Sequence, residues 1–293
     1  MKKSATCAGD ESFALENALS PVSNRLSRAP SSRGFSAVNE VNFFGSFITP
    51  DSLSTVFQPI VNLDGGEIFA YEALVRCDAP RFSPSVLFER AATARTTGRL
   101  GRMIREIAVS LCHGRPLFVN LHPAELAEGW LVRPDDPIFS HDDEIYLEIT
   151  ESAPLSHFEL CVDVLREVCG RPGVHLVIDD LGAGYSNIKL IADLEPKIVK
   201  LDRSLVQHID RKPRQQKLVS VVVHLCQQMG ATVVAEGIET HDEFSAVCDS
   251  GAQYGQGFLF ARPSFPAPGI SWPPSAEELP PTTRPGPVVT RRA

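Results

Sequence analysis

The sequence predicts an α/β protein, a (β/α)₈ TIM-like barrel with one antiparallel strand near the start. Short apolar runs alternate with amphipathic segments of helical length, a pattern typical of βαβ units and a mainly parallel sheet. Eight such runs fall within about 210 residues, which favours closure into a barrel. Polar residues stand near the ends of these runs, where barrel proteins carry their functional groups.

The expected strands are short. They span Val56–Val61, Ile68–Leu74, Leu117–His122, Ile145–Thr150, Leu176–Asp179, Ile198–Asp202, Thr232–Glu236 and Gly257–Phe260. Only the segment from Asn62 to Glu67 separates the first two strands, and its Gly65-Gly66 pair favours a tight turn. A helix does not fit there. We therefore expect a hairpin, in which one barrel strand runs antiparallel.

The expected helices fill the other gaps. They span Ser85–Thr97, Leu100–His113, Pro154–Cys169, Arg214–Met229 and Thr240–Ser250. The barrel should cover residues 47–264. Residues 1–46 lack a sustained hydrophobic period and predict a loosely ordered leader. Nine of the 23 prolines fall between Pro263 and Pro287, so residues 265–293 predict a disordered, proline-rich tail whose partner is unknown.

The composition is that of an ordinary soluble globular protein, with 43% apolar and 22% charged residues. A net charge of −8 argues against DNA, RNA or a membrane surface as a general partner, although local cations or bound metals can still hold a phosphorylated ligand. The seven cysteines are scattered and form no CxxC pair, so we expect reduced thiols and a cytoplasmic location. No run approaches the roughly 18 apolar residues of a membrane span.

Polar residues near the strand ends share a face with apolar neighbours. Successive strand residues alternate between the helix side and the barrel interior. With that period, Glu72 lies on the same face as Ala70 and Leu74. The same pattern places further polar residues at the ends of the later strands: Asn120, Glu148, Asp179, Lys200 and Glu236. These side chains should meet at the carboxyl end of the barrel.

Five carboxylates converge in this arrangement: Glu72, Glu148, Asp179, Asp180 and Glu236. Burying five like charges without partners would be very costly, so they should bind cations or stay partly protonated. Lys200 alone cannot neutralise them, whereas one or two divalent ions can. Oxygen ligands suit Mg²⁺ or Mn²⁺ rather than Zn²⁺. The adjacent Asp179 and Asp180 could bridge two ions, an arrangement that activates water for attack on a phosphodiester.

Each residue also has a simpler interpretation. A lone Asp or Glu at a strand end is more often a solvated loop residue or a helix cap. Lys200 could pair with Asp202, and the Thr150-Glu151 pair could cap the next helix. The segment Asp180–Tyr185 could be only a glycine-rich turn. These interpretations do not explain why all the residues stand at corresponding strand ends.

The sequence also carries a series of short motifs in a fixed order. They are FQPIV (Phe57–Val61), YEALVR with Glu72-Ala73-Leu74, FVNL (Phe118–Leu121), LEITES (Leu147–Ser152), IDDLGAGYSN (Ile178–Asn187), KIVKLDRS (Lys197–Ser204), VVAEGIET (Val233–Thr240) and GQGFLFARP (Gly255–Pro263). From about Thr55 to Pro263 the chain resembles the EAL family of cyclic di-GMP phosphodiesterases. Each motif is unremarkable alone, but their joint order and spacing are specific.

The resemblance implies a role for each matching residue. Glu72, Asn120, Glu148 and Asp179 would hold one metal ion, Asp179 and Asp180 a second, and Glu236 would be a ligand or the base for water. Lys200 would contact the attacking water, Gln256 would help to position it, and Glu151 would orient the ligands. The substrate side would include Gln58, Arg76, Asp202 and Glu239. A guanidinium such as that of Arg76 can bind phosphate oxygens bidentately.

The implied reaction is hydrolysis of cyclic di-GMP to linear pGpG with Mg²⁺ or Mn²⁺, by a barrel that forms a homodimer. The alternatives are a non-catalytic cyclic di-GMP receptor or protein-interaction module, and an enzyme for another phosphodiester. Receptors typically lose metal ligands, whereas every expected ligand is present here. The chain departs from the family at Leu181, where the family prefers Phe, and in the short segment between Cys77 and Ser83.

Overall fold

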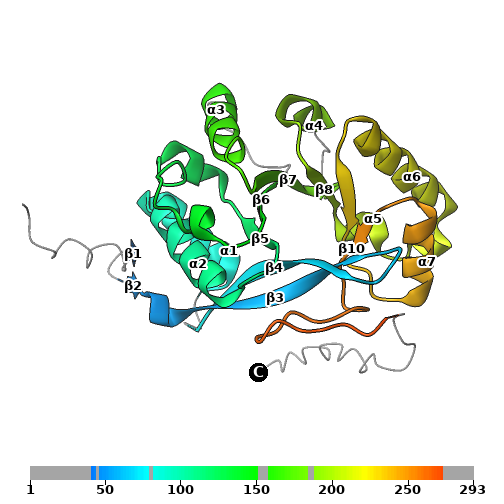
Figure 1. Ribbon diagram of the computed structural model, residues 1–293, viewed down its shortest axis with the longest axis horizontal. Coiled ribbons are helices and arrows are strands. Elements are labelled where there is room, and N and C mark those ends of the chain that lie inside the picture. The colour runs from blue at the N-terminus through cyan, green and yellow to red at the C-terminus, as the bar shows by residue number, and fades with distance from the viewer. Residues whose placement is uncertain (1–40, 44–45, 79–81, 151–157, 184–187, 273–293) are drawn as a thin grey trace, which may run out of the picture. The chain divides into compact units, whose positions relative to one another are not determined.

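The computed structural model describes residues 41–43, 46–78, 82–150, 158–183 and 188–272 (Figure 1). Several expectations therefore lie outside the described residues. They concern most of the leader, the beginning of the helix expected from Pro154, the side chain of Glu151, and the tail after Trp272.

Eight strands close into a barrel in the order β10, β3, β4, β5, β6, β7, β8, β9 (Figure 1). Their bounds are β3 Leu53–Asn62, β4 Ile68–Cys77, β5 Leu117–Asn120, β6 Ile145–Thr150, β7 Val174–Leu181, β8 Ile198–Leu201, β9 Thr232–Ala235 and β10 Tyr254–Gly255. β3 runs antiparallel to both of its neighbours, and all other neighbouring pairs are parallel. The predicted barrel with one antiparallel strand near the start is confirmed.

The α-helices of the described residues connect these strands on the outside of the barrel (Figure 1). They are α1 Pro84–Ala94, α2 Thr97–Leu111, α3 Phe158–Cys169, α4 Ile188–Leu194, α5 Arg203–Val206, α6 Pro213–Gln228 and α7 His241–Asp249. Short 3-10 helices are η1 Pro50–Ser52, η2 Pro123–Ala127, η3 Pro137–Ser140 and η4 Ile209–Arg211. α6 and α7 match their predicted ranges within one residue at each end. α4 and α5 were not predicted, because helices of seven and four residues are too short for a periodic signal.

The boundary between α1 and α2 differs from the prediction. α1 ends at Ala94 because Arg95 adopts a left-handed conformation with φ of 54°. α2 begins at Thr97, three residues before the expected Leu100. The carboxylate of Glu128 accepts hydrogen bonds from the backbone N–H groups of Thr97 and Gly98 at 3.1 and 2.9 Å. A distant side chain therefore satisfies the helix start, which no local sequence signal reveals.

The last barrel strand is also not where it was expected. The predicted range Gly257–Phe260 forms a turn, and the strand is β10, which pairs with β9 and β3. The turn packs against the backbone of Ile238. A Cβ at Gly257 would lie only 2.0 Å from the Ile238 carbonyl oxygen, so the chain at this point can approach only without a side chain. The apolar run is buried by this packing and not by strand pairing.

The barrel interior is filled by side chains rather than open. One cluster of inward-facing residues occupies it: Ile60, Ala70, Phe118, Tyr146, Val177, Ile198 and Val234. Three further clusters lie between the strands and the helices. The interior apolar residues lie below the polar strand ends and form a dry floor for them.

Residues 264–272, called the strap below, pack against the barrel. Ser264 pairs with Phe57 of β3, and Tyr71 of β4 donates a hydrogen bond to the carbonyl oxygen of Pro268 at 3.0 Å. Trp272 stacks on Phe260 with ring centroids 6.3 Å apart. The tail expected from residue 265 therefore begins too early. The high proline content of this segment concealed the aromatic residues that pack.

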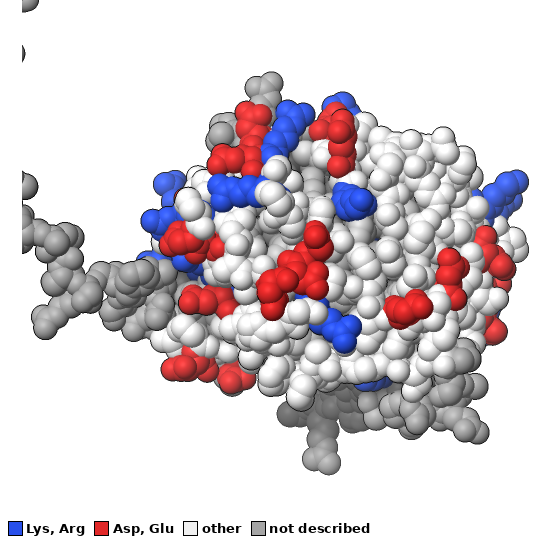
Figure 2. All heavy atoms as spheres, viewed as in Figure 1, with Lys and Arg blue, Asp and Glu red and all other residues white. Residues whose placement is uncertain are grey.

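The leader boundary also changes. β1 (Val41–Phe43) and β2 (Ser46–Ile48) pair as two short antiparallel strands, although residues up to 46 were expected to be loosely ordered. Ile48 is buried in a cluster with Phe82 and Leu87. On the face seen in Figure 2, the described Lys and Arg residues are interspersed with Asp and Glu. No helix within the described residues is long and apolar enough to cross a membrane.

Candidate metal centre

Lys200 of β8 lies among four carboxylates at the carboxyl end of the barrel. Its Nζ lies 2.5 Å from Glu236 Oε1, 2.6 Å from Glu148 Oε1, 3.3 Å from Asp179 Oδ1 and 3.6 Å from Glu72 Oε2. The carboxylates come from β4, β6, β7 and the residue after β9. The structure thus brings together five side chains that the period-2 pattern placed at the strand ends.

The Lys200 ammonium is almost inaccessible to water, with 1% of its side chain exposed. Burial alone would lower the pKa of Lys200, but Asp179, Glu148, Glu236 and Glu72 together raise it well above its usual value. The lysine therefore stays charged. One ammonium faces four carboxyl groups, so the cluster can accommodate more positive charge than Lys200 supplies.

Glu148 shows where that positive charge is missing. It is the most buried carboxylate of the cluster, and burial raises its pKa well above the usual value although the Lys200 charge opposes this. Its Oε1 faces the Lys200 ammonium. Its Oε2 has no hydrogen-bond partner within the described residues. A buried carboxylate oxygen without a partner, facing other carboxylates, fits a ligand to a cation.

Asp179 and Asp180 lie side by side at an irregularity of the sheet. The pairing of β7 with β8 shifts between Ile178 and Leu181, and Asp180 has a φ of 60°. Successive strand residues normally point to opposite faces, so this bulge is what allows both carboxylates to face the same site. One oxygen of Asp179, one of Asp180 and one of Glu236 lie within 4.8 Å of one another.

Two of these groups hold protons unusually well. Burial raises the pKa of Asp180 to about 6, and the neighbouring Asp179 adds to the effect. Burial also raises the pKa of Glu236 to about 8, against the attraction of Lys200. Both shifts have the same cause, because carboxylates that lose water and face one another resist ionisation. A divalent ion would reverse this balance.

Amide side chains border the cluster on its Glu72 side. Gln256 Nε2 donates to Glu72 Oε2 at 2.7 Å and to Gln58 Oε1 at 3.3 Å. Gln58 Nε2 donates in turn to the carbonyl oxygen of Ala261 at 3.2 Å. Asn120 Nδ2 donates to Glu72 Oε1 at 3.3 Å, which leaves its amide oxygen near the cluster. Glu72 is thus oriented by two amides from different strand ends.

Arg76 is not in direct contact with the cluster but lies beside it. It lines a hollow of about 280 Å³ together with Asn120 and Phe88, and Glu72 lines the same hollow. Its Nη1 donates to the Val75 carbonyl oxygen at 2.9 Å, and the side chain is exposed. A guanidinium at this position can reach a phosphate group of a ligand that also contacts the carboxylates.

The same hollow has a rigid wall formed by a buried ion-pair network. Arg105 is 1% exposed and contacts Glu125 Oε2 at 2.7 Å and Asp136 Oδ2 at 2.8 Å. A Cβ at Gly101 would lie 2.0 Å from Glu125 Oε2, so the glycine makes room for this carboxylate. The sequence analysis did not identify this network, because its members come from three separate elements.

The remaining predicted residues lie at the edge of the site. Asp202 is the N-cap of α5, and its Oδ1 accepts the Ser204 N–H at 2.9 Å, the simpler of its two interpretations. Glu239 accepts a hydrogen bond from Arg203 at 2.9 Å, and both line the hollow over the cluster. Sequence reasoning missed Arg203, whose only signal is its position after a strand end. Glu151 lies outside the described residues.

Leu181 is the position where the sequence analysis noted a departure from the family pattern. Leu181, which replaces the Phe preferred at this position, is buried and packs in the cluster beneath α4 and α6. Its carbonyl oxygen accepts the Asp202 N–H at 3.1 Å. The smaller side chain is therefore accommodated without an exposed apolar surface.

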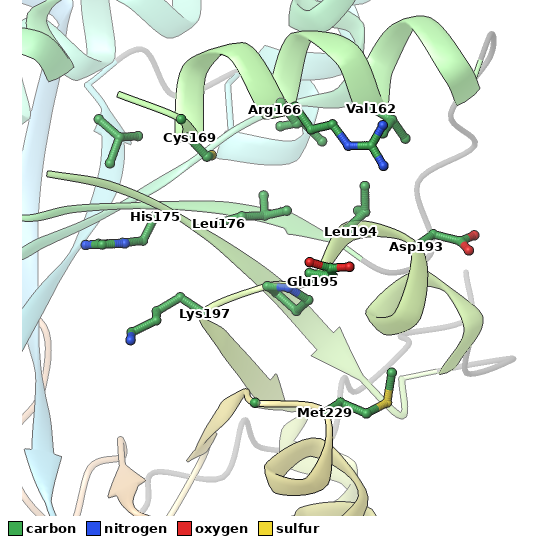
Figure 3. Close-up of a pocket in the computed structure, with 15 residues that line it drawn as sticks. Val162, Arg166, Cys169, His175, Leu176, Asp193, Leu194, Glu195, Lys197 and Met229 are labelled. Carbon is green, nitrogen blue, oxygen red and sulfur yellow. The ribbon is translucent and has the colours of Figure 1, made fainter. Parts of the chain in front are cut away.

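The larger hollow of the molecule is at the other end of the barrel. The carboxylate cluster lines a hollow of about 290 Å³ with Arg203, Phe258 and Gln256. A hollow of about 560 Å³ lies at the amino ends of β7 and β8, between α3 and α4 (Figure 3). Figure 3 shows Arg166, His175 and Lys197 there with Asp193 and Glu195, a mixture without convergent carboxylates. The converging carboxylates are in the smaller hollow, at the end of the barrel where enzymes of this fold place their functional groups.

The fold and this cluster define a class of protein: a closed barrel with converging carboxylates at its carboxyl end that could hold a cation. The family model for the EAL domain matches residues 46–263. The chain belongs to the EAL domain family.

Curated relatives agree with this assignment. The chain is 31% identical over 225 residues to "Cyclic di-GMP phosphodiesterase RocR" of Pseudomonas aeruginosa. This match covers 71% of this chain and 56% of that protein. It is 29% identical over 227 residues to "Cyclic di-GMP phosphodiesterase PdeR" of Escherichia coli, covering 73% of this chain and 34% of that protein. The chain thus spans about half or less of the length of these relatives.

Solved structures are similar as well. A manganese and cyclic di-GMP complex of Klebsiella pneumoniae BlrP1 is 32% identical, with a TM-score of 0.64, and the match covers 74% of this chain and 57% of that chain. A calcium and cyclic di-GMP complex of the same protein is 31% identical, with a TM-score of 0.64, and covers 73% and 57%. Both structures of BlrP1 contain a divalent ion together with cyclic di-GMP.

Proposed function

We propose that this protein is a metal-dependent phosphodiesterase that hydrolyses cyclic di-GMP to linear pGpG and so lowers the level of this second messenger. The observation that carries the proposal is the cluster itself, in which Glu148 keeps a buried carboxylate oxygen without a partner beside Asp179, Asp180 and Glu236. A receptor that only holds the dinucleotide does not need so many ligands. The relatives named as phosphodiesterases support the same substrate.

The donor set fits two Mg²⁺ or Mn²⁺ ions. We assign the first to Glu72, Asn120, Glu148 and Asp179, and the second to Asp179, Asp180 and Glu236. All donors are oxygens and none is a sulfur or an imidazole, which suits these hard cations. Bound divalent ions would supply Lewis-acid activation of water and neutralise charge on the phosphoryl oxygens.

The protein's own groups would do the rest. Lys200 keeps its proton and can donate a hydrogen bond to the attacking water. Glu236 would accept a proton from that water where it does not itself ligate an ion. Gln256 fixes Glu72 and can position the water, while Arg76 and Gln58 would hold the dinucleotide. Glu239 with Arg203 would border the substrate, and Glu151 would orient the ligands.

A turnover measurement tests this proposal. The purified full chain should convert cyclic di-GMP to pGpG with Mg²⁺ or Mn²⁺, lose this activity in excess chelator, and regain it when either ion is restored. Ca²⁺ should inhibit, because its larger radius and looser coordination hold a two-ion site less tightly. Unchanged hydrolysis in excess chelator would contradict the metal requirement. Binding of cyclic di-GMP without any turnover would make the protein a receptor.

We also propose that the barrel forms a homodimer through α6. Leu218 and Val221 are 51% and 61% exposed and lie one turn apart on this helix. Two copies could bury these side chains against each other. Sedimentation should give a dimer for the full chain and a monomer for Leu218→Glu. A monomeric wild type would contradict the proposal.

The described cysteines are free thiols, which supports a cytoplasmic location.

A further inference from the structure

The strap, residues 264–272, covers the outer face of the β3–β4 hairpin. In a (β/α)₈ barrel a helix normally covers each strand from outside. β3 leads directly into β4 through a turn, so no helix follows it. In Figure 1 the orange segment at the end of the described chain lies beside β3, and Ser264 pairs with Phe57 there. The family match ends at residue 263, immediately before the strap.

The first contact of the strap is with Phe57. Phe57 N–H donates to the Ser264 carbonyl oxygen at 2.9 Å, and Ser264 N–H donates to the Phe57 carbonyl oxygen at 3.0 Å. The Phe265 ring lies over the Phe57 ring, with centroids 6.4 Å apart. Phe57 is fully buried. The strap therefore adds a short piece of antiparallel pairing and an aromatic contact to β3.

The second contact is with Tyr71, and the third holds the end of the strap. Tyr71 Oη donates to the Pro268 carbonyl oxygen at 3.0 Å. At the hairpin turn, Trp272 lies so close to Gly66 that a Cβ there would be 2.0 Å from the indole Cδ2. Trp272 also stacks on Phe260 and contacts Phe244 edge-on at 5.6 Å. The strap is thus held against the middle of the hairpin strands and against the hairpin turn.

The two hairpin residues that the strap contacts on the outer face of the barrel each precede a residue of the site in the sequence. Phe57 precedes Gln58, and Tyr71 precedes Glu72. Successive strand residues point to opposite faces, so each outward contact has an inward counterpart. Gln58 and Glu72 face each other in register across the hairpin, and Gln256 bonds to both.

We propose that the strap is a positioning element of the metal centre. By fixing Phe57 and Tyr71 it holds Gln58 and Glu72 in the place where Glu72 can ligate a divalent ion. The inference rests on the proposed function, because it needs Glu72 as a ligand. It extends the catalytic unit beyond the residues that the family match covers.

The test uses the full chain with the double substitution Tyr71→Phe/Phe265→Ala. It removes one hydrogen bond and one ring contact of the strap and changes no residue that faces the site. Mn²⁺ affinity is measured by titration calorimetry, kcat and KM for cyclic di-GMP by product formation, and stability by thermal unfolding. Val219→Ala is the matched control, because Val219 is buried on α6 and the substitution removes none of the strap contacts described above.

The double variant should bind Mn²⁺ about 10-fold more weakly, the lower end of losses for groups that orient ligands. It should also lose kcat at temperatures where it is fully folded, with a smaller change in KM. Val219→Ala should melt at a lower temperature but keep its Mn²⁺ affinity. A second double variant, Tyr71→Phe/Phe265→Leu, keeps an apolar contact with Phe57. Its Mn²⁺ affinity should therefore be closer to that of wild type than the affinity of the Ala variant.

Two outcomes would overturn the inference, and they differ. If wild type binds Mn²⁺ and cyclic di-GMP and the double variant does so equally well while only its stability falls, the strap is merely a cover. If wild type binds neither ligand, the proposed function fails and the inference fails with it.

Discussion

Replacing Lys200 with Met tests how the carboxylate cluster is held together without a metal ion. The substitution keeps most of the side-chain length and removes the ammonium from four carboxylates. Removing one partner of a buried ion pair costs about 3–5 kcal/mol. Glu148 and Glu236 have raised pKa values and can take up protons in response, so we expect the lower end, about 3 kcal/mol.

That loss has a measurable size in chelator. For a domain of this length, 1 kcal/mol corresponds to roughly 2–4 °C in Tm, so Lys200→Met should melt about 6–12 °C below wild type. Mn²⁺ should then stabilise the variant more than wild type, because the ion replaces the missing charge. At a free Mn²⁺ concentration of about 100 times Kd, the gain is about 2.7 kcal/mol, which offsets most of the loss.

Although Mn²⁺ should restore most of the stability of Lys200→Met, it should not restore hydrolysis. Lys200→Met should lower kcat by at least about 10²-fold, while affinity for cyclic di-GMP measured in Ca²⁺ stays within a few-fold, because the ammonium acts mainly in the transition state. Lys197→Met is the control, since Lys197 is exposed at the other end of the barrel. If Lys200→Met in chelator has the same Tm as wild type, the ammonium does not hold the cluster together. Equal losses of binding and activity would make Lys200 a ligand-gripping residue.

Three further outcomes are expected. Mn²⁺ affinity should rise from about pH 6 to about pH 8, because Asp180 and Glu236, with pKa values of about 6 and 8, must lose protons before they bind the ion. An Mn²⁺ affinity that calorimetry finds independent of pH over this range would contradict the prediction. Glu72→Gln should stay folded and lose at least about 10²-fold in kcat, and wild-type turnover would place the site elsewhere. Arg105→Met leaves two buried carboxylates unpaired and should lower the free energy of unfolding by about 3–5 kcal/mol in urea titrations, so a loss below 1 kcal/mol would be inconsistent with the network.

The sequence predicted the barrel because its signals are local. Each strand is a short apolar run with polar residues near its end, and Glu72, Glu148 and Lys200 stand at the expected places. The Gly65-Gly66 turn made the hairpin visible. These features depend only on neighbouring residues, so the period of the sequence is enough to find them.

Other features depend on contacts between distant residues. The β-bulge that turns Asp179 and Asp180 toward one site has no local signature beyond the adjacent acids. The start of α2 depends on Glu128, some 30 residues away. The apolar run at Gly257 is buried against Ile238 without strand pairing. Proline content alone made residues 265–272 resemble a tail, and their contacts with Phe57, Tyr71 and Phe260 reveal that they pack.

The direction of β3 decides where the preceding chain reaches the barrel. In an all-parallel barrel the first strand starts at the end remote from the chemistry. Here Leu53 lies opposite Cys77 and Ser54 opposite Arg76, so β3 starts at the end of the barrel that carries the carboxylate cluster. Ser52 accepts the Asp78 N–H through its carbonyl oxygen at 3.0 Å, which joins the incoming chain to the segment just after Arg76. Force or ordering transmitted along the incoming chain would therefore arrive beside the carboxylate cluster, without crossing the barrel.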